Sequence, residues 1–193
     1  MISEDRKISP VLKIAGLVLL AVIGAAIGAA TARYIDASAL SDDDALNLFI
    51  GVVLIGMGVV MGGMLALRPA HVPKGCGLLQ IAVMTLAGIM LVLPIYGAGW
   101  LGAEVALAVV LALLVIQTVA NLMLWRKADE MLRRIMVETG SLAFWVLQLA
   151  LFVYAASERL GLVEGMTAWG MIGILMAVYM VASAITAARR GIK

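Results

Sequence analysis

The chain has 193 residues, of which 64% are hydrophobic and only 13% are charged, and its formal net charge is +2. A soluble domain of this length would need far more charge to cover its surface, so the composition argues against a water-soluble catalytic domain. The single cysteine, Cys76, excludes an internal disulfide bond.

Six long apolar runs divide the chain, each near the roughly 20 residues that a helix needs to cross a bilayer. They cover residues 11–33, 45–67, 76–98, 101–125, 139–157 and 166–188. The pattern predicts an all-α integral membrane protein with six transmembrane helices, built as one polytopic domain over residues 1–193. The first run has a basic start typical of a secretory signal, but it is long enough to span, so we expect it to remain as a helix.

The basic residues gather in alternate gaps between these runs. Twelve of the fourteen Lys and Arg residues lie at the N-terminus up to Lys13, or after the second, fourth or sixth run, and the other two are Arg33, at the end of the first run, and Arg159. By the positive-inside rule, both termini are therefore expected in the cytoplasm. Basic residues placed in this way are typical of anchors beside anionic lipid headgroups, so the expected partner is the lipid bilayer and not nucleic acid.

Local signals predict how some of the helices begin and end. Asp42 or Asp44 is expected to cap the second helix, since a carboxylate accepts hydrogen bonds from otherwise unpaired N–H groups there. A cation site at this Asp cluster is the less favoured alternative, because consecutive side chains point in different directions. Pro94 is expected to kink or end the third helix, because proline removes one backbone hydrogen bond. Glycines around Gly102 predict a tight turn into the fourth helix.

Glycine pairs are expected to give the first two helices close-packing faces. The four residues form two G-x-x-x-G motifs and are Gly24, Gly28, Gly58 and Gly62. Without a side chain, two backbones can approach closely and gain dispersion contacts that lipid does not match. Packing within one chain is the favoured interpretation, and a dimer face is the alternative.

Amide side chains at membrane depth form a second candidate group, consisting of Gln80, Gln117, Asn121 and Gln148. Gln117 and Asn121 are four residues apart and share a helical face, while Gln148 falls at the middle of the fifth run. These residues predict either hydrogen bonds between helices, which we favour, or a polar cavity. No acidic or basic residue lies near the centre of any run.

Residues 126–138 form the most distinctive segment, with charges at helical spacing on Asp129, Glu130, Arg133, Arg134 and Glu138. A helix here would pair Asp129 with Arg133, Glu130 with Arg134, and Arg134 with Glu138, each at i,i+4. The segment is therefore predicted to be an amphipathic helical extension of the fifth span. Glu138 lies where this helix enters the apolar layer, so its charge needs a cation close by.

The same segment carries a resemblance to known sequences. The order Asp129-Glu130-x-x-Arg133-Arg134-Ile135-x-x-Glu138, followed by a span containing Phe144, is similar to families of small uncharacterised bacterial inner-membrane proteins. They bear a D-E-x-x-R-R-[IV]-x-x-E-type signature before a helical hairpin. The resemblance covers residues 126–193 and implies a location in the bacterial inner membrane, but it implies no activity.

Enzyme signatures are almost absent from the sequence. It contains no H-E-x-x-H, G-x-S-x-G or phosphate-binding-loop motif. The plausible catalytic candidates, His71, Asp129 and Glu138, form no recognisable constellation, so we expect no catalytic, cofactor-binding or metal-binding residue and no cofactor. The sequence predicts a non-enzymatic accessory or scaffold subunit that acts through helix association, with a membrane-protein partner or as a homo-oligomer. A small transporter or channel for an uncharged or lipid-like molecule is the alternative.

Overall fold

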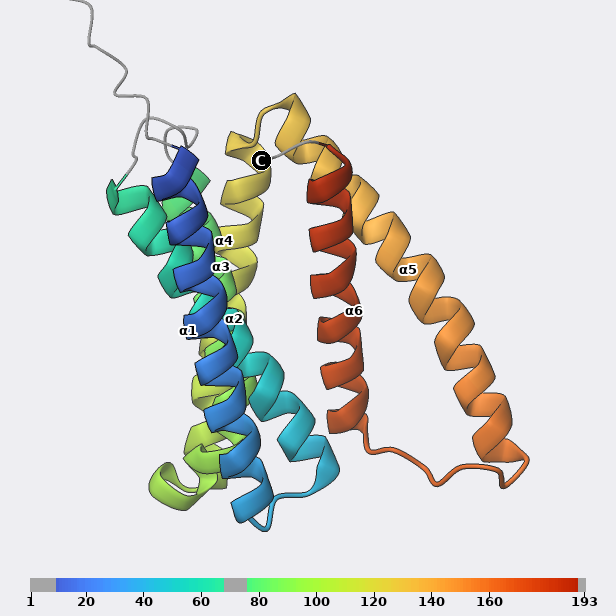
Figure 1. The fold of residues 1–193 in the computed structure, drawn as a ribbon. Coiled ribbons are helices and arrows are strands. Elements are labelled where there is room, and N and C mark those ends of the chain that lie inside the picture. The colour runs from blue at the N-terminus through green and yellow to red at the C-terminus, as the bar shows by residue number, and fades with distance from the viewer. Residues whose placement is uncertain (1–9, 68–75, 191–193) are drawn as a thin grey trace, which may run out of the picture. The chain divides into compact units, whose positions relative to one another are not determined.

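The computed structural model describes residues 10–67 and 76–190, and all regular secondary structure in these ranges is α-helical (Figure 1). The helices are α1 (Pro10–Ala37), α2 (Asp42–Leu67), α3 (Cys76–Leu101), α4 (Ala103–Lys127), α5 (Glu130–Arg159) and α6 (Ala168–Arg189). Five helices in the described ranges, α2 to α6, are long and apolar enough to cross a membrane. The all-α prediction is therefore confirmed, whereas the sixth span and the cytoplasmic termini stay predictions.

The chain divides into two compact units, and α1 belongs to the first. Proline suits the first turn of a helix, where its missing N–H has no intrahelical partner, and Pro10 begins α1. The helix continues to Ala37, four residues beyond the predicted run. Gly24 and Gly28 lie one turn apart on α1, and their role as a packing face stays a prediction.

The second unit begins at Leu40 and contains α2 to α6. Within it α2 packs against both α3 and α6, α3 also packs against α4, and α5 packs mainly on α6. The core is formed where α2 meets α3 and α6. Its buried residues are Ile50, Leu54, Ala87 and Leu91, with Trp169 and Met176 of α6 packed against them. Successive helices are therefore neighbours in the pairs α2–α3, α3–α4 and α5–α6.

Glycines bring the backbones of α2 and α3 into close contact. A Cβ atom added to Gly88 would lie only 2.6 Å from the carbonyl oxygen of Gly51. Gly58 is buried at the same interface, where a Cβ would collide with the hydroxyl of Thr85. Gly62 lies farther from α3, since a Cβ atom added there would be 4.0 Å from the side chain of Ile81. The second G-x-x-x-G pair therefore faces another helix of the same chain, as the favoured interpretation has it.

The start of α2 differs from the expected cap. The hydroxyl of Ser41 accepts a hydrogen bond from the Asp44 N–H at 3.2 Å and donates one to the Asp44 carboxylate at 2.9 Å. Ser41 is thus the capping residue, and neither Asp42 nor Asp44 takes that place. Serine and aspartate cap helices about equally well, so the choice depends on which residue begins the helix.

Pro94 was expected either to kink α3 or to end it. The helix continues through Pro94 to Leu101, so the prediction that it ends at this proline is wrong. Membrane helices tolerate proline because neighbouring groups satisfy the freed backbone carbonyl. Gly102 alone separates α3 from α4, with a φ of 80° that glycine adopts without steric cost. This is the tight turn that the sequence predicts.

Candidate functional site

The charged segment, residues 126–138, connects the end of α4 to the start of α5. Asp129 is the N-cap residue, and its side chain accepts a hydrogen bond from the Leu132 N–H at 2.7 Å. The helix then runs without interruption from Glu130 to Arg159. The charged residues and the fifth apolar run are therefore parts of a single helix, as the sequence predicts.

One of the three predicted i,i+4 ion pairs is present among the described residues, with Arg134 Nε 3.4 Å from Glu138 Oε1. Arg133 instead reaches back to the end of α4. Its guanidinium lies 3.4 Å from the carbonyl oxygens of Trp125 and Ala128, and 5.5 Å from the centre of the Trp125 ring. The last carbonyl groups of a helix have no intrahelical partner and attract a cation, which explains why Arg133 lies there.

A second partner for Glu138 comes from the end of α6. Arg190 is the C-cap residue of α6, and it donates one hydrogen bond to each carboxylate oxygen of Glu138, with 3.0 Å between its Nε and Oε2. The two side chains are only 33% and 38% exposed. The hydrogen bond to Glu138 raises the pKa of the Arg190 guanidinium above its usual range. This bidentate pair joins the start of α5 to the end of α6.

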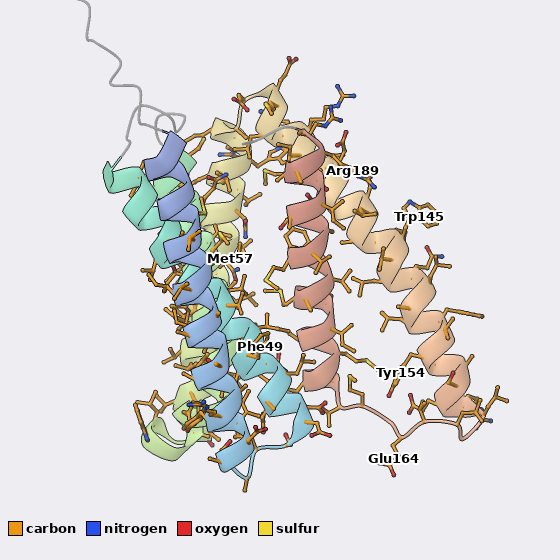
Figure 2. The ribbon with its side chains drawn as sticks, in the orientation of Figure 1. Phe49, Met57, Trp145, Tyr154, Glu164 and Arg189 are labelled. Carbon is orange, nitrogen blue, oxygen red and sulfur yellow. The ribbon has the colours of Figure 1, made fainter. Side chains whose placement is uncertain are left out.

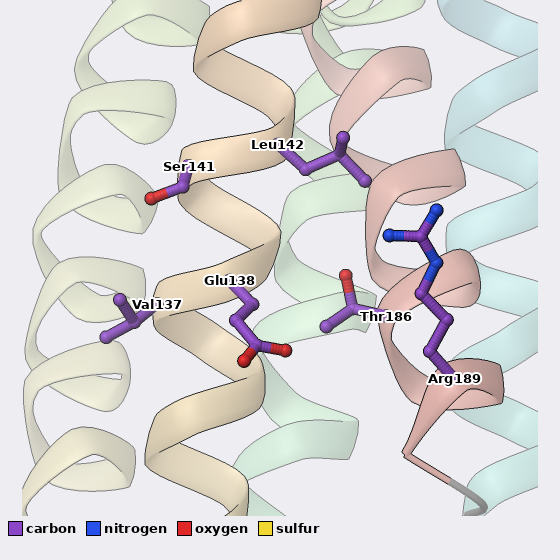
Figure 3. A pocket seen from close by; sticks show the side chains of 6 residues that line it. All are labelled: Val137, Glu138, Ser141, Leu142, Thr186 and Arg189. Atoms are coloured by element: carbon purple, nitrogen blue, oxygen red, sulfur yellow. The ribbon is translucent and has the colours of Figure 1, made fainter.

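A partly open pocket of about 250 Å³ lies beside this ion pair. It is lined by Val137, Glu138, Ser141 and Leu142 of α5 and by Thr186 and Arg189 of α6 (Figure 3). The Thr186 hydroxyl donates a hydrogen bond to the Ala182 carbonyl at 2.7 Å. Arg189 has no ion-pair partner within residues 10–67 and 76–190. The pocket therefore combines apolar walls with an unneutralised guanidinium.

The chemistry of this site has to be inferred from its own residues. Comparing the chain with protein-family models, curated proteins and solved structures found no match. In the part of the chain that the structure describes, no group of three or more His, Cys, Asp or Glu side chains is placed to hold a metal ion. The catalytic candidate His71 lies outside the described residues. What the pocket offers is a cationic group and hydrogen bonding at one end of the α5–α6 pair.

The four predicted amides are divided between two places. Gln117 on α4 donates a hydrogen bond to the Val83 carbonyl of α3 at 3.5 Å, and Gln80 and Asn121 lie half-buried on the same two helices. Gln148 lies on α5, which packs mainly on α6, and its side chain is exposed. The structure therefore does not bring Gln148 together with the other three.

A buried amide that the sequence did not single out joins α2 to α6. Asn47 is completely buried, and its Nδ2 donates to the carbonyl oxygens of Asp43 and Trp169, both at 2.9 Å. A Cβ on Gly173 would lie 3.1 Å from Asn47 Oδ1, so glycine leaves the space that this amide occupies. The Asp43 carboxylate accepts hydrogen bonds from the N–H and the hydroxyl of Thr167. Asp43 thus holds the start of α6, a role that became visible only with the pairing of α2 and α6.

Proposed function

We propose that this chain is a non-enzymatic, multi-pass protein of the bacterial inner membrane that acts through helix association, as an accessory or scaffold subunit. Six spans with both termini in the cytoplasm are supported by the alternating basic gaps. The bacterial inner membrane is supported by the resemblance of residues 126–193 to small proteins of that membrane. The proposal rests on the exposed surface of the outer half of α5, which we define as residues 144–159.

The two halves of α5 differ in what covers them. The first half buries Ile135, Thr139 and Ala143, whereas no residue from 144 to 159 is buried. The outer half exposes large apolar side chains, including 61% of Trp145 and 76% of Phe152. Figure 2 shows Trp145 directed away from α6. Lipid tails can cover such a face, so exposure alone does not identify a partner.

Gln148 distinguishes this face from an ordinary lipid-facing surface. It lies three residues after Trp145 and four before Phe152, on the side of the helix away from Ala143. It falls at the centre of the predicted fifth span and has no hydrogen-bond partner in the described part of the chain. An amide left unpaired in hydrocarbon costs free energy, since lipid tails offer neither donor nor acceptor.

The occupant that fits this face is α5 of a second copy. An amide carries both a donor and an acceptor, so two copies of Gln148 facing each other across a two-fold axis satisfy one another. Tryptophan and phenylalanine beside the amide supply apolar contact area on both sides of the axis. The proposed association is therefore a symmetric dimer in which polar side chains hydrogen-bond between helices.

Disulfide cross-linking in the membrane tests this dimer. In a Cys76→Ser background, Gln148→Cys is expected to give a covalent dimer on oxidation, because residues next to a two-fold axis bring their Cα atoms within the range that a disulfide requires. Leu149→Cys is the matched control, since Leu149 is 70% exposed but points about 100° away around the helix. Equal cross-linking at both positions, or none at Gln148→Cys, would contradict the proposal.

A second measurement separates the amide from the apolar face. Gln148→Leu is expected to weaken dimerisation about 3- to 18-fold, because interhelical hydrogen bonds in membranes contribute about 0.6 kcal/mol on average and up to about 1.7 kcal/mol. Dilution of the labelled protein in vesicles, followed by energy transfer between copies, measures this change. An unchanged dimer in Gln148→Leu would mean that the amide is not at the interface.

The transporter alternative is not favoured by any observation. It requires Gln80, Gln117, Asn121 and Gln148 to line one cavity, whereas three of them lie along α3 and α4 and the fourth is exposed on α5.

A further inference from the structure

Arg189 is an unpaired charge at the edge of the pocket between α5 and α6. Its neighbours Arg134 and Arg190 share the carboxylate of Glu138, whereas Arg189 has no ion pair within the described residues. Figure 3 shows its side chain running back along α6 from the last turn, toward the level of Leu142. This direction follows from helix geometry, because the Cα–Cβ bonds of a helix tilt toward its N-terminus. Arg189 lines the same pocket as Glu138 and Ser141, which lie on either side of residue 139, where the fifth apolar run begins.

We propose that Arg189 binds the phosphate group of an anionic phospholipid whose headgroup occupies this pocket. Arginine side chains near helix ends reach the membrane interface, where lipid phosphates are available to accompany their charge, and Arg189 is such a residue, exposed in the last turn of α6. Arginine binds phosphate through two parallel hydrogen bonds, which a compact ammonium group cannot form. The pocket of about 250 Å³ places the apolar side chains of Val137 and Leu142 beside the charge, where they contact the less polar part of the lipid.

The charges around the pocket favour an anion. Three arginines, Arg134, Arg189 and Arg190, surround one carboxylate, that of Glu138, and this leaves two positive charges. Glu138 lines the pocket and would repel a phosphate, but both its oxygens accept hydrogen bonds from Arg190. Ser141 lies on the same lining with an exposed side chain. The net field is therefore positive on the side of Arg189.

The position of the pocket favours a lipid over a free phosphate ion. The pocket lies at the level where α5 enters the apolar layer, and there phospholipid headgroups are the concentrated source of phosphate. In the predicted orientation this end of the helices faces the cytoplasm, where anionic lipids give the membrane surface a negative potential. The bound lipid would neutralise Arg189 and contact both α5 and α6.

Lipid titration of the purified full-length chain in mild detergent tests the site. Phosphatidylglycerol is compared with phosphatidylcholine of the same acyl chains and with inorganic phosphate, using the unfolding temperature and native mass spectrometry as readouts. Phosphatidylglycerol is expected to remain bound and to raise the unfolding temperature, while the other two have little effect at equal concentration.

Substitutions at two basic residues locate the effect. Arg189→Gln is expected to weaken phosphatidylglycerol binding about tenfold, which corresponds to one lost charge-assisted interaction. Arg189→Lys keeps the charge but not the paired donors, so we expect a smaller loss. Arg126→Gln is the matched control: it removes an exposed charge at the end of α4, outside the pocket, and is expected to change the affinity by less than about twofold.

Three results would overturn the proposal. Equal binding of phosphatidylcholine would show that the anionic headgroup is not recognised. An equal response to inorganic phosphate would show that the ligand is a free anion. An equal loss in Arg126→Gln and Arg189→Gln would show a general surface-charge effect in place of a site at Arg189.

Discussion

The contact between α2 and α3 and the outer half of α5 are both strongly apolar, yet they are built from different residues. The first uses glycines, so that a Cβ on Gly88 would lie 2.6 Å from the Gly51 carbonyl oxygen. The second uses large side chains, such as Phe152, which is 76% exposed. The difference shows that hydrophobicity alone does not decide which membrane-protein surface is buried.

The physical reason is that lipid tails are as apolar as the side chains themselves. Burying leucine or phenylalanine between membrane helices gains little over leaving it in lipid, whereas close backbone packing gains dispersion contacts that lipid does not match. The α2–α3 contact is therefore complete within one chain. On the outer half of α5, lipid tails can cover the apolar side chains. The amide of Gln148 needs a hydrogen-bond partner, which lipid tails do not offer.

The largest expected effect comes from adding one methyl group to the tight contact. Gly88→Ala is expected to lower the free energy of unfolding by about 2–3 kcal/mol, because the new Cβ meets backbone oxygen and the side chain of Ile55 at 2.7 Å, and neither can move away easily. Reversible unfolding in mixed micelles, followed by circular dichroism, measures the change.

Gly140→Ala is the matched control on α5. A Cβ there meets nothing within 4 Å, and alanine has the higher helix propensity, so we expect a change of less than about 1 kcal/mol, in the stabilising direction. If the two substitutions had the same effect, close glycine packing would not be what distinguishes the α2–α3 contact.

The positions of the helices could be predicted from the sequence far better than their partners. Length and hydropathy are local properties, so each apolar run became a helix with ends within a few residues, and the charged segment extends α5 back to Glu130, as its i,i+4 spacing predicts. The pairing of α2 with α6 depends on Asn47 and Trp169, which are 122 residues apart. No periodicity in either segment indicates the other, so this contact could not be predicted.

The candidate site was also predicted only in part, because some of its contacts are local in the sequence and others are not. The spacing of Arg134 and Glu138 indicates their pair directly, because i,i+4 residues meet on any helix. The need of Glu138 for a cation was also predictable, but the choice of Arg190 was not, since it requires the end of α6 to lie beside the start of α5. The spacing of Asp129 and Arg133 predicts a pair as well, yet each residue caps a different helix end.

A smaller effect is expected from replacing two amide residues that lie in different surroundings, Asn47 in a buried contact and Gln148 on an exposed face. Asn47→Ala removes two hydrogen bonds inside the α2–α6 contact and is expected to lower the free energy of unfolding by about 1–2 kcal/mol. Gln148→Ala removes an exposed amide and is expected to leave the unfolding of the dilute monomer unchanged within about 0.5 kcal/mol. The same micelle unfolding experiment compares them.

Measuring dimerisation of Asn47→Ala and Gln148→Ala separates the two amides further. Asn47→Ala is expected to keep the dimer and lose stability, whereas Gln148→Ala is expected to keep stability and weaken the dimer. A loss of monomer stability in Gln148→Ala would mean that this amide has a partner within its own chain, and the outer half of α5 would then resemble the α2–α3 contact more than the exposure of its side chains suggests.

The smallest expected effect concerns the polar link that holds the start of α5 to α6. Glu138→Gln removes the ion pairs with Arg134 and Arg190, but these side chains are partly exposed, and exposed ion pairs contribute little. The loss of stability should therefore be smaller than in Asn47→Ala and should shrink further at high salt, which screens the wild-type pairs. Glu164→Gln, at an exposed loop residue beyond the end of α5, is the control for removing one negative charge. A loss in Glu138→Gln as large as that in Gly88→Ala would mean that charge, more than close backbone packing, holds the helices of this chain together.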